Sequence, residues 1–323
     1  MVEEILPGLY RMEIHLPRSP LKATNSYLIR GRERCLIVDT GFNQEECMND
    51  MLSCLHTLNV DLKDADFFIT HLHADHLGLV GELATDSSKV YFNQGDAPLA
   101  NPGREYWEQL GAFFKAHGFP EEAIEGVVKR HPGRVHGPKR DIDFCILKEG
   151  DRIDVGDYSF TCIETPGHTP GHTCLYEADR KVLLCGDHIL FDITPNITTW
   201  PGMKDSLGQY LRSLDKVREL DVGLVLPGHR GNSNDHRKRI GELQEHHRAR
   251  LMEVAAALED GGKTAFQVAP WVTWDIQISS WEAFPMVQKV FAVGETLAHL
   301  EYLEGEGSIH RSVEDGTIVF SLR

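Results

Sequence analysis

Four side chains of the kind that bind metal ions lie in one short segment of this chain. Residues 71–76 read HLHADH and contain His71, His73, Asp75 and His76. Imidazole and carboxylate groups suit zinc, iron and manganese. So many polar groups placed together need water or cations to satisfy them. The simpler alternative is an exposed histidine run of the kind found in linkers.

Two later segments supply further histidines, each directly after a Pro-Gly pair. The first reads TPGHTPGHT and contains His168 and His172, and the second reads LPGHRG and contains His229. Proline and glycine at these positions are typical of tight turns. Three histidine-bearing segments, far apart in sequence, are therefore candidates for one shared site.

Apolar runs lead into these polar segments. The run LLCGDH reads as a short buried strand that ends in a turn, with Asp187 at its tip and His188 directly after it. Residues 67–70 lead in the same way into the first histidine loop, and residues 223–226 lead into His229. We therefore expect several strands to end at the same place, with polar tips around it.

The order of the motifs HxHxDH, TPGH, GD and PGH resembles the metallo-β-lactamase fold superfamily of metal-dependent hydrolases, over about the first 230 residues. The resemblance implies an α+β fold, the αββα sandwich, with two half-domains facing each other across a pair of divalent metal ions. It also implies a set of metal ligands. These are His71, His73 and His168 for the first ion, Asp75, His76 and His229 for the second, and Asp187 as the bridge between them.

The same resemblance implies residues that support the site. The family pattern selects the first histidine of TPGHTPGHT as a ligand, so His172 is expected to support the site or face the substrate, as is His188. Asp39, in the segment VDTG, matches an aspartate that in the family supports the metal loop, and such carboxylates fix the orientation of metal ligands. The alternative for Asp39 is a turn residue after a buried strand.

The implied ligand set predicts a mechanism. Two divalent cations that share a carboxylate lie ~3.5–4 Å apart and lower the pKa of a water between them towards ~7. A hydroxide is then available at neutral pH, and Asp75 is expected to orient it as the catalytic residue. Zinc is the expected metal, with iron and manganese as alternatives. A GxSxG nucleophile motif and CxxC pairs are both missing from the sequence, so other catalytic schemes have little support.

Departures from particular branches narrow the reaction class. Metallo-β-lactamases proper commonly carry a cysteine or a non-ligand where Asp187 stands, and flavodiiron proteins carry glutamate where His73 stands. The full pattern resembles glyoxalase II thioesterases, lactonases, ribonucleases and persulfide dioxygenases with one iron. The prediction is a hydrolase of a small acyl substrate, a thioester or lactone. A ribonuclease or phosphodiesterase, an iron oxygenase and a metal-binding protein without turnover stay open as alternatives.

Composition bounds the partners and the compartment. The net charge of −16 disfavours a nucleic-acid partner and leaves a small molecule as the expected substrate. Seven cysteines, an odd number, indicate free thiols in a reducing compartment, and the acidic first residues do not resemble a secretory signal. Without an apolar stretch of spanning length, we expect no membrane partner and a cytoplasmic protein.

Periodicity predicts two domains. The catalytic domain is expected over residues 1–235, with a helical, lid-like insertion at about 93–140. Strands are expected at 9–14, 25–29, 35–38, 67–69, 153–155, 159–163, 172–176, 182–185 and 223–226, and helices at 44–58 and 204–219. In the insertion, Trp107 and Phe114 either pack a helix onto the body or line an apolar substrate pocket. Trp200 is a further candidate for the wall of that pocket.

A second domain is expected over residues 236–323. Helical patterns at 240–258, 265–272 and 281–303 precede two strands, 308–313 and 317–322, joined by an Asp-Gly turn. Three helices and a hairpin indicate a winged-helix-like domain, and similar domains occur in a branch of the superfamily that includes lactamase-β-like proteins, some of which cleave RNA. Its acidic balance favours packing or a homodimer over DNA. A basic cluster near its start is either a solvated helix face or a contact for an anionic substrate tail; its members are Arg230, Arg237, Lys238, Arg239, Arg248 and Arg250.

Overall fold

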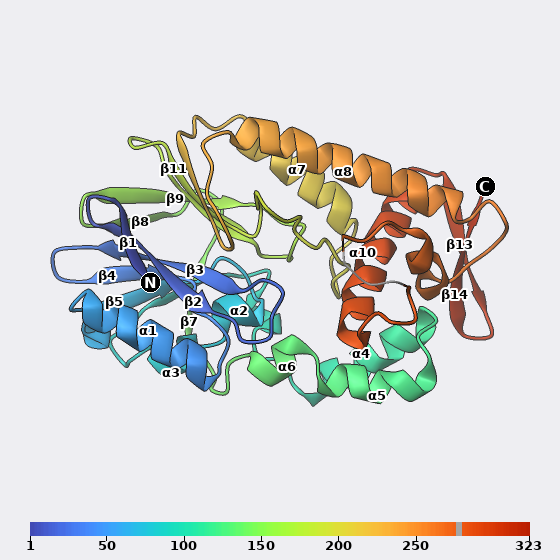
Figure 1. Cartoon of the computed structure of the whole chain (residues 1–323), viewed down its shortest axis with the longest axis horizontal. Coiled ribbons are helices and arrows are strands. Elements are labelled where there is room, and N and C mark those ends of the chain that lie inside the picture. Colours follow the sequence, from blue (N-terminus) through green and yellow to red (C-terminus); the bar gives the residue numbers. More distant parts are fainter. Residues whose placement is uncertain (276–279) are drawn as a thin grey trace. The chain divides into compact units, whose positions relative to one another are not determined.

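The computed structural model describes residues 1–275 and 280–323 (Figure 1). The chain divides into two compact units, each built from three stretches of sequence. Unit 1 comprises Met1–Asn101, His136–Pro195 and Ser213–Arg239. Unit 2 comprises Pro102–Val135, Asn196–Arg212 and Ile240–Arg323.

This division differs from the predicted one. The sequence predicts a catalytic domain over residues 1–235 with a lid-like insertion at about 93–140. In the structure, most of that insertion and the stretch Asn196–Arg212 belong to the unit that holds the carboxy-terminal residues. The physical reason is burial of apolar side chains. Phe114 and Phe119 from the insertion share one hydrophobic core with Val254 of the carboxy-terminal part.

Unit 1, all of whose residues are described, contains a seven-stranded sheet in the order β1-β2-β3-β4-β5-β6-β7. The first four strands pair antiparallel, and β4 to β7 pair parallel. The strands are β1 (Val2–Leu6), β2 (Leu9–His15), β3 (Ala23–Arg30), β4 (Cys35–Val38), β5 (Ala65–Phe68), β6 (Val90–Asn93) and β7 (Phe144–Leu147).

The second sheet of unit 1 has five strands in the order β12-β11-β10-β9-β8. Its strands are β8 (Arg152–Val155), β9 (Tyr158–Glu164), β10 (Thr173–Glu177), β11 (Val182–Gly186) and β12 (Leu224–Pro227). Among neighbouring strands of this sheet, only β11 and β12 pair in parallel, so both end at the same edge. That edge is where the sequence places two of the polar tips.

Alternation along the strands produces two cores. Successive side chains of a strand point to opposite faces of the sheet. In β4, Leu36 and Val38 therefore join Phe160 and Leu184 of the second sheet in a core between the two sheets. Ile37 points the other way.

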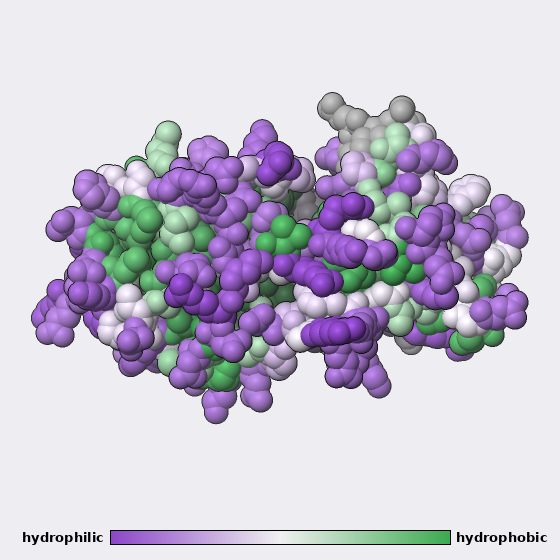
Figure 2. Space-filling view, turned by 90° about the horizontal axis from the view of Figure 1, so that it is seen from below, coloured by the Kyte–Doolittle hydropathy of each residue, from purple (hydrophilic) through white to green (hydrophobic). Residues whose placement is uncertain are grey.

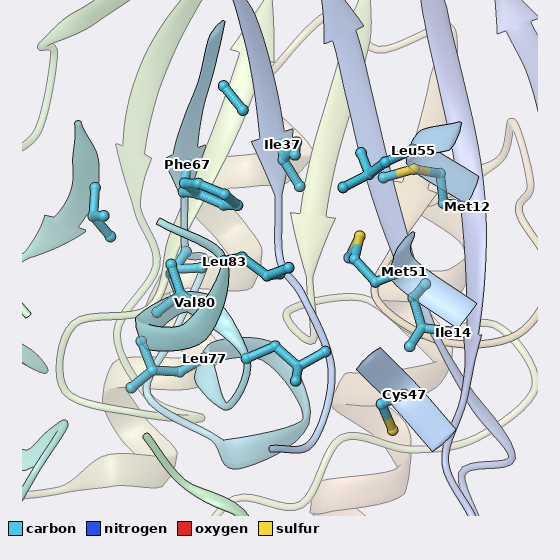
Figure 3. Packing of buried hydrophobic residues seen from close by; sticks show 14 of the residues in the cluster. Met12, Ile14, Ile37, Cys47, Met51, Leu55, Phe67, Leu77, Val80 and Leu83 are labelled. Carbon is cyan, nitrogen blue, oxygen red and sulfur yellow. The ribbon is translucent and has the colours of Figure 1, made fainter. Parts of the chain in front are cut away.

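The second core lies between the seven-stranded sheet and helices on its outer face. Figure 3 shows Met51 and Leu55 of α1 (Glu45–Thr57) and Leu83 of α3 (Val80–Leu83) packed with Ile37 and Phe67 of the sheet. On the other sheet, Ser213 in the second half of α7 (Ser206–Arg218) donates a hydrogen bond to the carbonyl oxygen of Pro166, just beyond β9. Two sheets with helices outside them make the predicted αββα sandwich.

The remaining elements of unit 1 are short. They are α2 (Ala74–Leu77) and the 3-10 helices η1 (Leu62–Asp64) and η2 (Ala97–Leu99). Another helix, α6 (Pro132–His136), ends at the first residue of the second stretch of unit 1.

The described part of unit 2 is mainly helical. It contains α4 (Arg104–Ala116), α5 (Glu121–Lys129), most of α8 (His236–Ala256), α9 (Ala265–Val268), η3 (Ala269–Trp271), α10 (Met286–Gly305) and the hairpin of β13 (Ile309–Glu314) with β14 (Thr317–Leu322). Asp315 and Gly316 both have positive φ, 47° and 79°, as a two-residue hairpin turn requires. The predicted order of helices and hairpin after residue 236 is confirmed, and the winged-helix name stays a prediction.

Hydrophilic residues cover most of the face shown in Figure 2, with hydrophobic areas between them. Among the residues that the structure describes, none of the helices is both long and apolar enough to span a membrane.

Candidate metal centre

The first histidine loop follows β5. The chain leaves the strand at Phe68, and His73 in an extended conformation (φ −62°, ψ 143°) precedes the first turn of α2. That turn contains Asp75 and His76, both buried. A sharp change of direction after a buried strand thus presents all four polar side chains of the HLHADH segment in one short stretch.

The other predicted ligands lie at strand ends of the second sheet. His168 is in the loop between β9 and β10, Asp187 directly follows β11, and His229 follows β12. Gly228 is required next to His229, because a Cβ atom there would lie 2.5 Å from Oδ1 of Asp187 and 2.7 Å from Cε1 of His76. Backbone from one strand end thus approaches side chains of two other segments.

The structure brings all seven predicted ligands together in unit 1. The ligand atoms of His71, His73 and His168 lie within 4.8 Å of one another, and so do those of Asp75, His76 and His229. The carboxylate of Asp187 reaches both groups. Its Oδ2 is 3.7 Å from Nε2 of His168 and 3.4 Å from Nε2 of His229, and its Oδ1 is 3.5 Å from Nε2 of His76.

Hydrogen bonds select the tautomers of the histidines. Nδ1 of His229 lies 2.7 Å from the carbonyl oxygen of Ala23, which only accepts, so Nδ1 carries the proton. Nδ1 of His76 lies 2.7 Å from Oδ2 of Asp39 and donates to it. Nε2 of each ring then points into the site, and the two Nε2 atoms are only 3.2 Å apart.

This arrangement of candidate ligand atoms fits a divalent cation. In neutral rings, the Nε2 atoms of His76 and His229 would bring two lone pairs together in a buried place, which a cation between them would satisfy. The adjoining group of His71, His73 and His168 offers a second set of imidazoles. Imidazole and carboxylate ligands suit zinc, iron and manganese.

Asp39 holds the first loop in place. It has a φ of 59° and is buried. Its Oδ1 accepts the backbone N–H of Thr70 at 2.8 Å, and its Oδ2 accepts the hydroxyl of Thr70 at 2.8 Å. Since that hydroxyl lies 2.9 Å from Nδ1 of His71, Asp39 and Thr70 together leave Nε2 of His71 to face the site.

The two groups differ in their electrostatics. Burial, with the neighbouring His168, lowers the pKa of His73 to about 3. Burial also opposes charge on His229, but Asp187 and Asp75 outweigh it and raise the pKa of His229 to about 10. Although burial alone would raise it, His76 and His229 lower the pKa of Asp75 to about 2. The carboxylates of the second group thus favour a charged His229, whereas burial favours a neutral His73.

His172 and His188 lie behind the ligands. Nδ1 of His172 is 2.7 Å from the hydroxyl of Thr165, and its Nε2 accepts the backbone N–H of Asp187 at 3.2 Å. His172 thus contacts the main chain of Asp187. His188 is fully buried, with its ring centroid 6.0 Å from that of His172, and burial lowers its pKa to about 3.

The aromatic candidates for a substrate wall belong to unit 2. Phe114 is only 4% exposed and lies in the core with Phe119, which favours its packing interpretation. Trp107 is half-buried beside a cavity of about 420 Å³, with the guanidinium of Arg134 5.6 Å from its ring centre. Trp200 is also half-buried.

The predicted basic cluster is largely engaged in structural contacts. Arg237 donates to the carbonyl oxygens of Arg218 and Leu220, and Arg239 donates to those of Leu190 and Ile193. Arg230 donates to the carbonyl oxygen of Pro20, Arg248 pairs with Glu245, and the buried Arg250 pairs with Glu295. Most of these guanidinium groups thus have partners within the protein, which the interpretation as a solvated helix face does not require.

Sequence reasoning missed three residues that shape the site. Tyr27 and Asn25, both in β3, donate to the carbonyl oxygen of Pro227 at 2.8 and 3.0 Å, which fixes the turn before His229. Asp96 accepts hydrogen bonds from two ligand loops. The available signal for Asn25 was its position as a polar residue at the start of the predicted strand 25–29.

A sequence comparison decides the family. The model of the metallo-beta-lactamase superfamily matches residues 20–229, and a second model, the metallo-beta-lactamase-like C-terminal domain, matches residues 251–323. The chain belongs to the metallo-beta-lactamase superfamily. Superfamily relatives include the probable metallo-hydrolase YqjP of Bacillus subtilis, 27% identical over 91% of this chain and 92% of that protein. The human acyl-coenzyme A thioesterase MBLAC2 is 25% identical over 64% of this chain and 72% of that protein.

Solved structures of the superfamily agree. A metallo-beta-lactamase family protein of Thermus thermophilus has a TM-score of 0.81 and 32% identity, covering 99% of this chain and 100% of that one. A beta-lactamase domain protein of Burkholderia ambifaria has a TM-score of 0.80 and 26% identity, covering 100% and 93%. The family of this chain and its buried groups of histidine and aspartate together indicate a metal-dependent hydrolase.

Proposed function

We propose that this protein is a binuclear metal-dependent hydrolase that cleaves a small acyl compound, a thioester or a lactone. The observation that carries the proposal is the position of Asp187, whose carboxylate reaches histidines of both ligand groups. A carboxylate shared in this way is the usual bridge of two-metal hydrolytic sites. The similarity to acyl-coenzyme A thioesterase MBLAC2 favours the thioester.

The proposed metal is zinc, with iron or manganese as alternatives. His71, His73 and His168 would hold one ion, Asp75, His76 and His229 the other, and Asp187 both. Such ions, when bound, polarise the carbonyl oxygen of a substrate and lower the pKa of a water towards ~7.

The protein's own groups supply orientation and proton handling. Asp75 stays ionised beside His76 and His229, so its carboxylate is the proposed acceptor of a hydrogen bond from the attacking water. Asp39 keeps the proton of His76 on Nδ1, and His172 keeps the backbone of Asp187 in place. These contacts hold the ligands in the geometry that the chemistry needs.

Trp107 and Trp200 remain proposed contacts of the acyl or leaving portion of the substrate. Trp107 is partly exposed, whereas Phe114 is buried. Replacing Trp107 by Ala should raise KM for long acyl chains more than for acetyl compounds. An unchanged ratio of kcat/KM between long and short chains would remove Trp107 from the substrate wall.

The experiment that tests the function is elemental analysis of the purified protein, followed by assays with thioesters, lactones, phosphodiesters and β-lactams. We expect about two metal ions per chain and hydrolysis of a thioester or a lactone. The Asp187→Asn variant, which removes the shared charge, should lose most of that activity. One iron per chain with oxygen consumption would instead support an oxygenase. Phosphodiester cleavage with salt-dependent binding of single-stranded RNA would support a ribonuclease.

A further inference from the structure

We propose that Asp96 is the positioning residue that joins the two loops carrying His71, His73 and His168, and so sets the metal-binding geometry of this group. The inference rests on the proposed metal centre, and it concerns a residue that is not itself a ligand. Asp96 lies after β6, at the start of η2, and its side chain is completely buried.

Three donors from two loops converge on the carboxylate of Asp96. Its Oδ2 accepts the backbone N–H of Leu72 at 2.9 Å and the hydroxyl of Thr169 at 2.7 Å. Its Oδ1 accepts the backbone N–H of Gly171 at 2.6 Å. Leu72 stands between the ligands His71 and His73, and Thr169 directly follows the ligand His168.

Close packing of the backbone accompanies these bonds. A Cβ atom on Gly171 would lie 2.5 Å from the backbone nitrogen of Asp96, and one on Gly95 would lie 2.9 Å from the carbonyl oxygen of Pro170. Only glycine permits this approach at both positions. The backbone around Asp96 therefore packs directly against the loop that carries His168. A change in the Asp96 carboxylate should shift the position of that loop.

The site calls for a carboxylate and not an amide. Oδ2 of Asp96 accepts from both loops, through Leu72 and Thr169, and Oδ1 accepts from Gly171. An asparagine must turn its NH₂ group either towards the N–H of Gly171 or towards the N–H of Leu72, and in either orientation two donors face each other. The Asp96→Asn variant should therefore let the His71–His73 loop and the His168 loop shift relative to each other, although its volume is nearly unchanged.

The test uses Co²⁺ as the probe, titrated into the metal-free full-length protein and followed by its visible absorption. For Asp96→Asn we expect affinity for Co²⁺ to fall by about 10–100-fold, as for other residues that orient metal ligands, together with an altered absorption spectrum. A merely structural role would lower stability and leave the spectrum unchanged. Wild-type affinity and spectrum in this variant would overturn the inference.

Two further measurements keep the outcome decisive. Thr169→Val removes one donor and leaves the carboxylate, so it should shift affinity and spectrum in the same direction by a smaller amount; wild-type values there would also overturn the inference, even if Asp96→Asn failed to fold. Asp50→Asn, a surface carboxylate that also contacts a histidine, His15, should behave as wild type. If wild type binds Co²⁺ but hydrolyses no acyl compound, the proposed function fails and the role of Asp96 stands.

Discussion

Oδ2 of Asp39 lies 2.7 Å from Nδ1 of His76, and both side chains are almost completely buried. One carboxylate oxygen thereby fixes which nitrogen of His76 faces the candidate metal centre. Burial lowers the pKa of His76, but Asp39, Asp187 and Asp75 together raise it well above its usual value. The strength of this pairing makes Asp39 the first place to test the site.

Replacing Asp39 by Asn should weaken metal binding without removing a ligand. The amide keeps the size of the side chain but has only one acceptor oxygen. It therefore cannot accept hydrogen bonds from both the backbone N–H of Thr70 and Nδ1 of His76 as the two carboxylate oxygens do. We expect a loss of metal affinity of about 10–100-fold, measured by competition with a chelator. Asp50→Asn is the matched control, and equal affinities in the two variants would contradict the role of Asp39.

The two histidines of TPGHTPGHT should behave differently. His168→Ala removes a proposed ligand, so metal content should fall and turnover should be lost. His172→Ala removes a contact to the backbone of Asp187, so metal should be retained while kcat falls. Metal analysis of both purified variants checks this, and metal loss confined to His172→Ala would show that the ligand assignment is reversed.

Replacing Arg250 by Ala should strongly destabilise unit 2. The guanidinium pairs with Glu295 where both side chains are less than 10% exposed, and it lies 4.5 Å from the ring centre of Trp274. Its removal leaves a buried carboxylate without its main partner, at an expected cost of about 3–5 kcal/mol.

Denaturant unfolding followed by tryptophan fluorescence measures this cost, because the five tryptophans of the chain, at 107, 200, 271, 274 and 281, all belong to unit 2. The control is Arg248→Ala on the same helix, where an exposed pair with Glu245 contributes little. Similar unfolding midpoints for the two variants would contradict the prediction.

The stability of unit 2 should fall as pH rises from 4.5 towards 7. Burial raises the pKa of Glu301 to about 7, with Arg311 opposing the shift and Glu304 adding to it. The folded protein then keeps a proton that the unfolded chain, with a pKa near 4.5, has released. This contribution to stability is complete below pH 4.5 and is lost as pH passes through about 7.

Thermal unfolding by tryptophan fluorescence at pH 5 and pH 8 tests the role of Glu301. The Glu301→Gln variant cannot titrate, so its Tm should change less between the two pH values than that of the wild type. Glu306→Gln, at an exposed position directly after the same helix, should keep the wild-type change. An identical pH dependence in wild type and Glu301→Gln would refute the assignment.

Much of the fold followed from local patterns in the sequence. Two strands that are buried throughout, at 35–38 and 182–185, were predicted to within one position, because a short continuous apolar run bounded by turn residues is typical of a fully buried strand. The strands β1, β6 and β7 were missed. Residues such as Cys145 and Ile146 in β7 are exposed, so only pairing with a neighbouring strand makes the segment a strand.

The ligand residues could be predicted because the order of HxHxDH, TPGH, GD and PGH resembles the metallo-β-lactamase superfamily, and that resemblance implies the ligand set. Asp96 could not be predicted in this way, since a single aspartate ahead of an Ala-Pro pair looks like an ordinary turn residue. Its importance arises from Leu72 and Gly171, which are distant in sequence. The same limit applied to residues 102–135, whose apolar faces gave no sign of which part of the chain would cover them.

The candidate ligands come from both sheets of the sandwich: His71, His73, Asp75 and His76 follow β5 of one sheet, and His168, Asp187 and His229 adjoin strands of the other. Any ion that these residues share would cross-link the two sheets through its coordination bonds. It would thereby hold the two sheets together at one end of the core between them. Depletion of metal should therefore open unit 1 along that seam first, and backbone amides near the ends of β5 and β11 should exchange their hydrogen sooner than those of the outer helices.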